Sequence, residues 1–265
     1  MKKFIAVLIS LSIFYCQTIY AGVTFDVLDD SISCGTTDDI LKENAALTIA
    51  AAIFPNTVGE NGFGRIISRH DSVGGGEVFL CTTATATLSF RVNGGTQLVR
   101  TSSNGSITLG AWNIVIVTWD GGVTASNVHI YVANAANSWV LTETSYATTT
   151  NGVTPTDNSA GTTYIGTHAT GSRTFDGPIE AIDVFNSVVS NLGNLAVRLK
   201  RMGFKNSVQP KMYLALDECT AGATCSTAGM FRDLTGNGHN CSPANSPVGA
   251  ANNILSYPPQ GVQVS

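Results

Sequence analysis

Thr174-Phe-Asp-Gly-Pro-Ile-Glu-Ala-Ile-Asp-Val-Phe-Asn186 is an apolar run of strand length that begins at an Asp-Gly pair, and Trp112-Asn-Ile-Val-Ile-Val-Thr-Trp-Asp-Gly-Gly122 is a similar run that ends at one. Asp tolerates positive φ and Gly adopts it freely, so these pairs are typical of tight turns between strands. Both faces of 113–119 are apolar, which predicts a strand in the middle of a sheet, covered on both sides. Neither segment carries groups arranged for a reaction. Together they predict a β-sandwich that presents loops.

Short β-rich runs separated by turn residues recur along the chain, as is typical of an all-β sandwich or barrel. In 127–133, Val128, Ile130 and Val132 alternate with more polar residues, which predicts one buried and one wet face. The expected strands lie near 23–34, 47–54, 64–69, 77–82, 86–93, 96–100, 113–119, 127–133, 138–143, 162–166, 178–186 and 211–216.

One helix interrupts the strands, near 190–202. Ser190 is a suitable N-cap, and apolar residues follow at helical spacing, at positions 192, 195, 196, 199 and 202. Gly203 can end the helix in the left-handed conformation. We expect this helix to pack against a sheet edge; an amphipathic membrane helix is the alternative.

Residues 1–21 have the pattern of a signal peptide, with Lys2 and Lys3 before an apolar run that is too short to span a bilayer. A membrane anchor and a lipoprotein attached through Cys16 are the alternatives. We expect cleavage before Gly22, a sandwich domain over 22–203, and a C-terminal segment, 204–265, packed on it. The mature chain would have no membrane span and would be secreted or held at the cell surface.

Charge argues against one class of partner. Only 12% of residues are charged and the formal net charge is −4, which becomes −6 without Lys2 and Lys3. Binding to nucleic acid draws its affinity from Lys and Arg contacts with phosphates, so we expect no nucleic-acid partner.

The cysteines that remain after removal of the signal peptide are odd in number: Cys34, Cys81, Cys219, Cys225 and Cys241. An odd count leaves one of them outside intrachain disulfides or paired with another chain. Cys219 and Cys225 flank a short polar loop and are the first choice for a disulfide, with Cys225 and Cys241 nearly as suitable. No Cys-x2-Cys pair is present, which argues against zinc.

Several segments resemble, in order, the strands of LamG-like jelly-roll domains, in the concanavalin A-like lectin/glucanase superfamily. They are Val23-Thr-Phe-Asp-Val-Leu-Asp-Asp-Ser-Ile-Ser-Cys-Gly35, Leu47-Thr-Ile-Ala-Ala-Ala-Ile-Phe-Pro55, 112–122, Val128-His-Ile-Tyr-Val132, Tyr164-Ile-Gly166 and 175–186. Asp233-Leu-Thr-Gly-Asn-Gly-His239 is similar to a turn that often precedes the opening strand in this family, whereas here it follows the closing one.

The resemblance implies a two-sheet antiparallel jelly roll, in a family that contains carbohydrate binders, adhesion modules and structural repeats. It also implies one structural calcium ion, held by Asp26, Asp29 or Asp30 together with Asp183. Oxygen ligands of this kind suit Ca²⁺. The alternative for Asp183 is a salt bridge to Arg65, Arg69 or Arg173, or a hydrogen bond that caps a turn.

Catalysis is not expected. Glycosidases of the superfamily place acids two residues apart on a strand, whereas Glu180 and Asp183 are three apart and should point to opposite faces. No Gly-x-Ser-x-Gly motif marks a nucleophile. The candidate ligand-binding residues are aromatic, charged and imidazole side chains at loop edges: Trp139, Tyr146, His70, Asp71, His168 and Arg173.

The sequence therefore predicts a secreted, non-catalytic module that binds a glycan or another cell-surface ligand. A structural subunit of a fibre, surface layer or virion, formed by self-association, is the first alternative. A polysaccharide-cleaving enzyme is the second.

Overall fold

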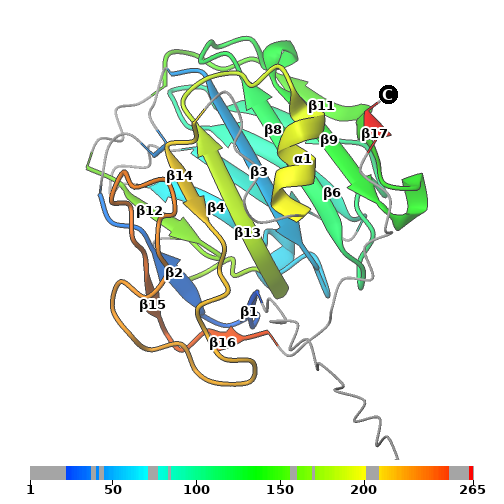
Figure 1. Cartoon of the computed structure of the whole chain (residues 1–265). Helices are drawn as coiled ribbons and strands as arrows, with labels where there is room; N and C mark the ends of the chain where they lie inside the picture. Colours follow the sequence, from blue (N-terminus) through cyan, green and yellow to red (C-terminus); the bar gives the residue numbers. More distant parts are fainter. Residues whose placement is uncertain are drawn as a thin grey trace, which may run out of the picture.

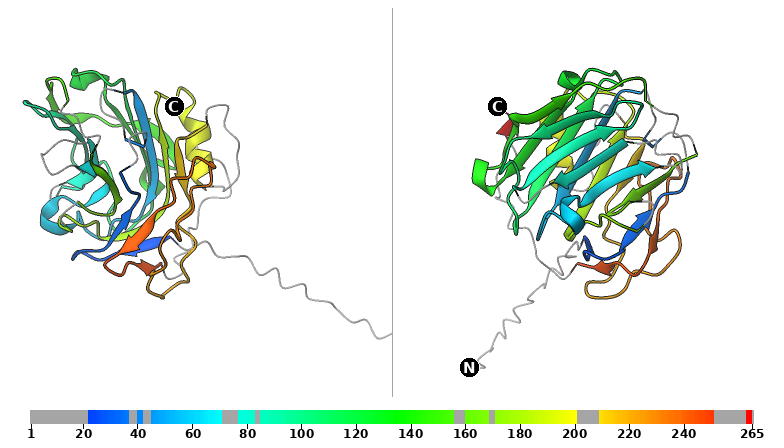
Figure 2. Two further views of the ribbon diagram at one scale, coloured as in Figure 1. Left: turned by 90° about the vertical axis from the view of Figure 1, so that its left-hand side faces the viewer. Right: turned by 180° about the vertical axis from the view of Figure 1, so that it is seen from behind.

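The chain folds into two antiparallel β-sheets packed face to face, with one helix on the outside of the first sheet (Figures 1 and 2). The computed structural model describes residues 22–36, 40–41, 45–70, 77–82, 85–155, 160–168, 171–200, 209–250 and 263–264. The expected signal peptide, 1–21, lies outside these residues. Within them, no helix is long and apolar enough to cross a membrane.

The first sheet has nine strands, and β13 lies near its centre. The order is β16 (Val248–Gly249), β1 (Val23–Phe25), β13 (Gly177–Phe185), β3 (Leu47–Ile53), β8 (Asn113–Trp119), β9 (His129–Asn134), β10 (Val140–Glu143) and β17 (Gln263–Val264), with β14 (Met212–Leu214) also beside β13. β17 runs parallel to β10, and the other pairs in this sheet are antiparallel.

The second sheet has eight strands, all paired antiparallel. The order is β11 (Tyr146–Thr150), β7 (Leu98–Ser102), β6 (Thr87–Val92), β5 (Glu77–Thr82), β4 (Arg65–His70), β12 (Thr162–Ile165), β2 (Ser31–Ser33) and β15 (Ser242–Ala244). Three short 3-10 helices lie in the described connections: η1 (Glu60–Gly62), η2 (Ala125–Asn127) and η3 (Ala135–Asn137).

Strand β8 is covered on both faces, as its sequence predicts. Val115 and Val117 belong to the main core between the sheets, whereas Ile114 and Ile116 belong to a second apolar cluster on the outer face of the first sheet. The helix α1 (Leu192–Lys200) covers this second cluster with side chains that include Leu195 and Leu199 (Figure 1). The predicted alternation in β9 is also confirmed, since Val128, Ile130 and Val132 are buried while His129 and Tyr131 are half-exposed.

The predicted helix is confirmed, but its N-cap is wrong by one residue. The side-chain oxygen of Asn191 accepts a hydrogen bond from the backbone N–H of Asn194 at 3.1 Å, so Asn191, not Ser190, caps the first turn. The helix packs against the face of the first sheet rather than against an edge.

Three strand predictions need correction. The expected strand 23–34 is two strands, β1 and β2, which belong to different sheets. Residues 146–150, which are not among the expected strands, form the edge strand β11. In β13 a register shift between Ile179 and Ala181 moves Ile179 into the main core, whereas Ala181 and Phe185 face α1. Without this shift, the alternation of a regular strand would place all three residues on one face.

The C-terminal segment docks on the sandwich and extends both sheets. β14 and β16 join the first sheet, and β15 joins the second beside β2. The expected disulfide between Cys219 and Cys225 is confirmed, and a second disulfide, which was not predicted from the sequence, connects Cys34 to Cys241. The alternative pairing of Cys225 with Cys241 is therefore wrong. The side chain of Cys81 lies outside the described part of the chain.

Candidate functional site

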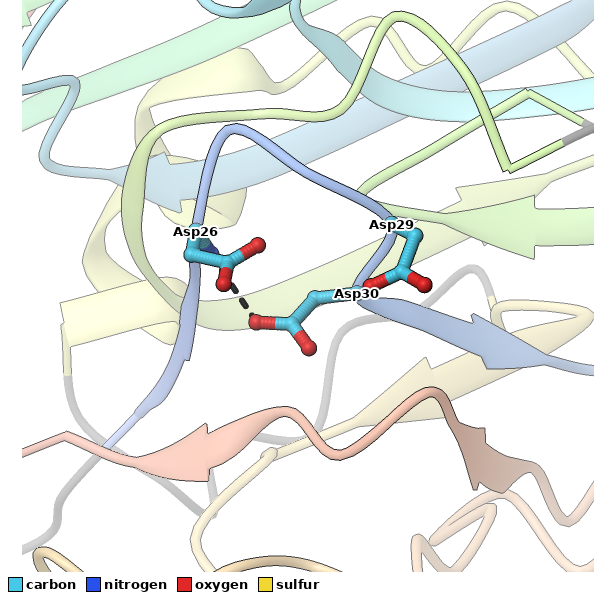
Figure 3. A group of neighbouring side chains, drawn as sticks. All are labelled: Asp26, Asp29 and Asp30. Atoms are coloured by element: carbon cyan, nitrogen blue, oxygen red, sulfur yellow. Dashed lines mark hydrogen bonds between the residues drawn. The ribbon is translucent and has the colours of Figure 1, made fainter.

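Three carboxylates gather in the loop between β1 and β2, where Asp26, Asp29 and Asp30 face one another (Figure 3). One ligand oxygen from each lies within 4.8 Å of the others. The backbone N–H of Asp26 donates a hydrogen bond to Oδ2 of Asp30 at 2.9 Å, and the N–H of Leu28 donates to Oδ1 of Asp26 at 2.9 Å. Backbone N–H groups of the loop thus bind two of its own carboxylates, which keeps these side chains close together.

The electrostatics of this group suit a hard cation. Asp30 is 5% exposed, and its burial, followed by the negative charges of Asp26 and Asp29, raises its pKa to about 6 despite the hydrogen bond from Asp26. A divalent cation would relieve that repulsion, and carboxylate oxygens are ligands that Ca²⁺ takes. The residues present therefore fit calcium in donor type and spacing.

Asp183 does not join this group, contrary to the expectation from the resemblance. It pairs with Ala50 of β3 and Tyr213 of β14, in the second half of β13. The loop that carries Asp26 follows β1, which pairs with the opposite end of β13, at Gly177 to Ile179. The side chain of Asp183 is fully buried. Among the described residues, the acidic group consists of the three loop aspartates.

A pocket of about 310 Å³ opens between the 103–106 loop and the edge of the first sheet. We call it the hydroxyl pocket, because most of its lining side chains are alcohols and amides. The lining residues are Ser103, Asn104, Gly105, Ser106, Val132, Asn137, Thr142, Glu143, Thr144 and Ser145. The Oγ1 atom of Thr144 is buried and has no hydrogen-bond partner among the described residues.

A network of side chains fixes Glu143, which is the one carboxylate in that lining. The Tyr146 hydroxyl donates a hydrogen bond to Oε1 of Glu143 at 2.7 Å and accepts one from the backbone N–H of Ile130 at 2.8 Å. Nδ1 of His129 lies 2.7 Å from the same Oε1. The guanidinium of Arg100 stacks 3.5 Å above the Tyr146 ring. These contacts hold the carboxylate in one orientation.

The same contacts set the pKa values of this network. Burial alone would raise the pKa of Glu143, but the hydrogen bonds from His129 and Tyr146, with the charges of His129 and Arg100, hold it below its usual value. Burial first, and the bond to Glu143 second, raise the pKa of the Tyr146 hydroxyl above its usual value even though the Ile130 N–H and the Arg100 charge oppose this. Glu143 is therefore a fixed, ionised acceptor at neutral pH.

Three arginines and one aromatic ring form a second polar group, which we call the arginine cluster: Arg65, Arg91, Arg173 and Phe63. The guanidinium carbons of Arg91 and Arg173 lie 5.3 and 5.4 Å from the centre of the Phe63 ring. The backbone N–H of Arg65 donates a hydrogen bond to the carbonyl of Arg173 at 3.1 Å, which fixes the start of β4 against the loop before β13.

The predicted ligand-binding residues that the structure describes lie in several places. Tyr146 lies next to the hydroxyl pocket, and Arg173 belongs to the arginine cluster. Trp139 is half-buried and packs against the cluster beneath α1. His168 lies in a turn closed by bonds between its backbone and that of Gly171 and Ser172.

The two remaining candidates, Asp71 and the side chain of His70, fall outside the described residues. Arg65, Arg91, Glu143 and the pocket hydroxyls were missed, because only the folded chain brings these dispersed residues together.

The acidic side chain that interacts with Glu180 is Asp217, which belongs to the C-terminal segment. Burial raises the pKa of Glu180 to about 7, and the charge of Asp217 adds to the shift. Its Oε2 atom is buried without a hydrogen-bond partner among the described residues.

Comparison with known proteins agrees with this architecture. A family model described as the concanavalin A-like lectin/glucanases superfamily matches residues 29–192. A search of curated proteins found no match. Among solved structures, a putative carbohydrate binding protein from Bacteroides ovatus is 16% identical, with a TM-score of 0.49, over 87% of this chain and 61% of that one.

Two further solved structures match at similar identity. The heptameric SAP-like pentraxin from Limulus polyphemus is 14% identical, with a TM-score of 0.43, over 72% of this chain and 88% of that one. Mouse laminin α1 domains LG4-5 are 13% identical, with a TM-score of 0.39, over 62% of this chain and 40% of that one. Because the family model covers more than half of the sequence, the protein belongs to the concanavalin A-like lectin/glucanase superfamily.

Proposed function

We propose that this protein is an extracellular, non-catalytic module that binds glycans through the hydroxyl pocket. The observation that carries the proposal is the lining of that pocket, where alcohols and amides surround a single fixed carboxylate. Sugars present many hydroxyl groups that both donate and accept hydrogen bonds, and such a lining can satisfy both roles.

Two residues are suited to direct contact with a sugar. Glu143 is an acceptor whose position is set by Tyr146 and His129, so little side-chain entropy is lost when a ligand hydroxyl donates to it. The Thr144 hydroxyl is buried in the pocket wall without a partner in the described structure, and once it turns toward the pocket it can form the missing hydrogen bond with a ligand group.

The number of carboxylates in the pocket supports the proposal that the protein is not a glycosidase. Retaining glycosidases use two carboxyl groups about 5–5.5 Å apart, and inverting enzymes use two at a larger distance. The hydroxyl pocket has only Glu143 in its lining. The extracellular location is supported by the two disulfides, which persist in oxidising compartments.

A structural calcium ion is part of the proposal. Asp26, Asp29 and Asp30 would supply three of the six to eight oxygen ligands that Ca²⁺ takes. Bound there, the ion would fix the connection between β1 and β2, which joins the two sheets.

A glycan array with two matched variants tests the binding site. Thr144→Val replaces the pocket hydroxyl by a methyl group of equal size, and Thr220→Val makes the same change at an exposed position outside the pocket. We expect wild-type protein and Thr220→Val to bind the same neutral glycans, and Thr144→Val to lose at least about tenfold in affinity. A blank array for the wild type, or equal binding by both variants, contradicts the proposal.

The same preparation tests the alternatives. Release of reducing ends from a bound polysaccharide would show an enzyme and contradict the non-catalytic assignment. A native mass much larger than one chain, with no glycan bound, would instead favour a structural subunit that assembles with copies of itself.

A further inference from the structure

The arginine cluster concentrates positive charge on a chain whose formal net charge is −4. Arg65 begins β4, Arg91 lies in β6, and Arg173 lies in the loop before β13. Arg91 follows Phe90 and precedes Val92, which are both in the core, so its side chain leaves the opposite face of the second sheet. Three separate elements therefore contribute one guanidinium each.

Arg65 is the informative member of the cluster. It is 6% exposed, and its Nε and Nη1 atoms are buried without a hydrogen-bond acceptor among the described residues. A buried guanidinium without acceptors is costly, and the positive charges of Arg91 and Arg173 add to that cost. Burial, followed by these two like charges, lowers the pKa of Arg65 to about 9.

Acidic side chains do not compensate the cluster within the described structure. None of the three arginines has a carboxylate within 4 Å there, and the hydrogen bond from Nε of Arg91 goes to the Ser89 hydroxyl at 3.3 Å. Glu60, in the adjacent loop, accepts hydrogen bonds from the Thr174 N–H and the Asn61 side chain, one on each carboxylate oxygen.

We propose that the arginine cluster binds the anionic group of an acidic saccharide, either a sugar carboxylate or a sulfate ester, as a subsite apart from the hydroxyl pocket. Guanidinium groups match both oxyanions with paired N–H donors. The Phe63 ring holds Arg91 and Arg173 through cation–π contacts, so these donors are positioned before the ligand arrives. The inference rests on the proposed glycan binding and adds the class of saccharide.

The bound oxyanion would supply what Arg65 lacks. It would accept hydrogen bonds at the cluster and offset the repulsion among the three charges. Because Arg173 is exposed and Arg91 and Phe63 are half-exposed, a ligand on the surface can reach the cluster.

The test is calorimetric titration of the full chain with three oligosaccharides of similar length. Oligogalacturonate carries carboxylates, heparin oligosaccharide carries sulfates as well, and dextran is neutral. We expect at least one acidic ligand to bind about tenfold or more tightly than dextran. Binding of oligogalacturonate identifies a carboxylate site, and binding of heparin alone identifies a sulfate site. Equal affinities for all three overturn the inference.

Variants locate the binding. Arg91→Gln and Arg173→Gln should each weaken the acidic ligand about tenfold or more, whereas Arg232→Gln, at an exposed position of the C-terminal segment, should not. Arg65→Met should keep or raise the melting temperature of the free protein and abolish the rise that the acidic ligand causes. Unchanged affinity in both Arg91→Gln and Arg173→Gln overturns the inference.

The same variants separate this inference from the proposed function. Neutral glycans that bind through Thr144, without any preference for acidic ones, would remove the arginine subsite and leave the pocket. Acidic saccharides that bind through Arg91 and Arg173, with no effect of Thr144→Val on any glycan, would remove the pocket and leave the arginine subsite.

Discussion

Cys34 and Cys241 form a disulfide that joins the end of β2 to the start of β15 across a sequence separation of 207 residues. The two strands are also paired in the second sheet, with Ser33 opposite Ser242. The bridge therefore anchors the C-terminal segment, which extends both sheets, to the opening of the domain.

Removing this disulfide should destabilise the protein more than removing the other one. In the chain-entropy account, a bridge across about 200 residues contributes about 5 kcal/mol, whereas one that closes a loop as short as Cys219–Cys225 contributes about 2 kcal/mol. We expect Cys34→Ala/Cys241→Ala to lose about twice the unfolding free energy that Cys219→Ala/Cys225→Ala loses. Urea titration of both double variants measures this, and equal losses would contradict the entropic argument.

Gly166→Ala should be among the most damaging single-methyl changes in the chain. Gly166 has φ of +82°, and an added Cβ would lie 2.2 Å from the ring of Phe25, which is fully buried. Strain in the left-handed region costs about 1 kcal/mol, and overpacking of the core adds about 1–3 kcal/mol.

Gly105→Ala is the matched control, because Gly105 also has positive φ, at +71°, but nothing lies within 4 Å of the added methyl. It should lose only the backbone contribution, about 1 kcal/mol. Thermal melting of the two variants separates the contributions, and a Gly166→Ala protein as stable as Gly105→Ala would show that the Phe25 contact is relieved by repacking.

The extent to which the sequence predicts this fold depends on how local the signal is. The strand pattern of 113–119 and the helix near 192–200 are local, and the structure confirms both. The change of sheet between β1 and β2 and the register shift in β13 depend on partner strands that are far away in sequence. A period of two cannot reveal either of them.

The sites show the same limit. The aspartates of the β1–β2 loop are neighbours in sequence, so their proximity could be predicted, whereas the remote Asp183 was assigned to them wrongly. Arg91 is a single basic residue in an apolar strand, and only the folded sheets bring it to the same ring as Arg173, whose carbonyl accepts a hydrogen bond from the backbone N–H of Arg65.

Asp30 should make stability fall as the pH rises from about 4 to about 6. Its pKa is raised from 3.8 to about 6, so the folded chain holds the proton in a range where the unfolded chain has released it. The contribution of Asp30 to stability is therefore greatest below about pH 4 and declines through this window. It levels off above about pH 6, after a total loss of at most about 3 kcal/mol.

Asp30→Asn removes the titrating group, so its stability should lack this decline, and at pH 7 it should exceed that of the wild type in the absence of calcium. Unfolding by urea at several pH values measures the difference. Millimolar Ca²⁺ should raise the melting temperature of the wild type at pH 7 but not that of Asp30→Asn. Parallel pH profiles for the two proteins would contradict the role assigned to Asp30.

Tyr146→Phe should destabilise the fold at the edge of the hydroxyl pocket. The hydroxyl accepts a hydrogen bond from the N–H of Ile130, a buried residue, and donates one to Glu143, so its removal leaves the N–H without an acceptor. An unsatisfied buried group of this kind costs about 1–3 kcal/mol. Tyr131→Phe is the control, because no hydrogen bond of the Tyr131 hydroxyl occurs within the described structure, and it should change stability little.

The loss of stability at low pH gives an independent test of the hydrogen bond between Tyr146 and Glu143. The pKa of Glu143 is held below its usual value in the folded chain, so its contribution is present at neutral pH and is lost as the pH falls through the folded pKa. Without the bond from Tyr146 the pKa of Glu143 should move back toward 4.5, and acid should cost Tyr146→Phe less stability than it costs the wild type. Urea unfolding at pH 7 and pH 3 measures both effects. If Tyr146→Phe and Tyr131→Phe behaved alike at both pH values, the hydrogen bonds of Tyr146 would contribute nothing to holding Glu143 in the pocket.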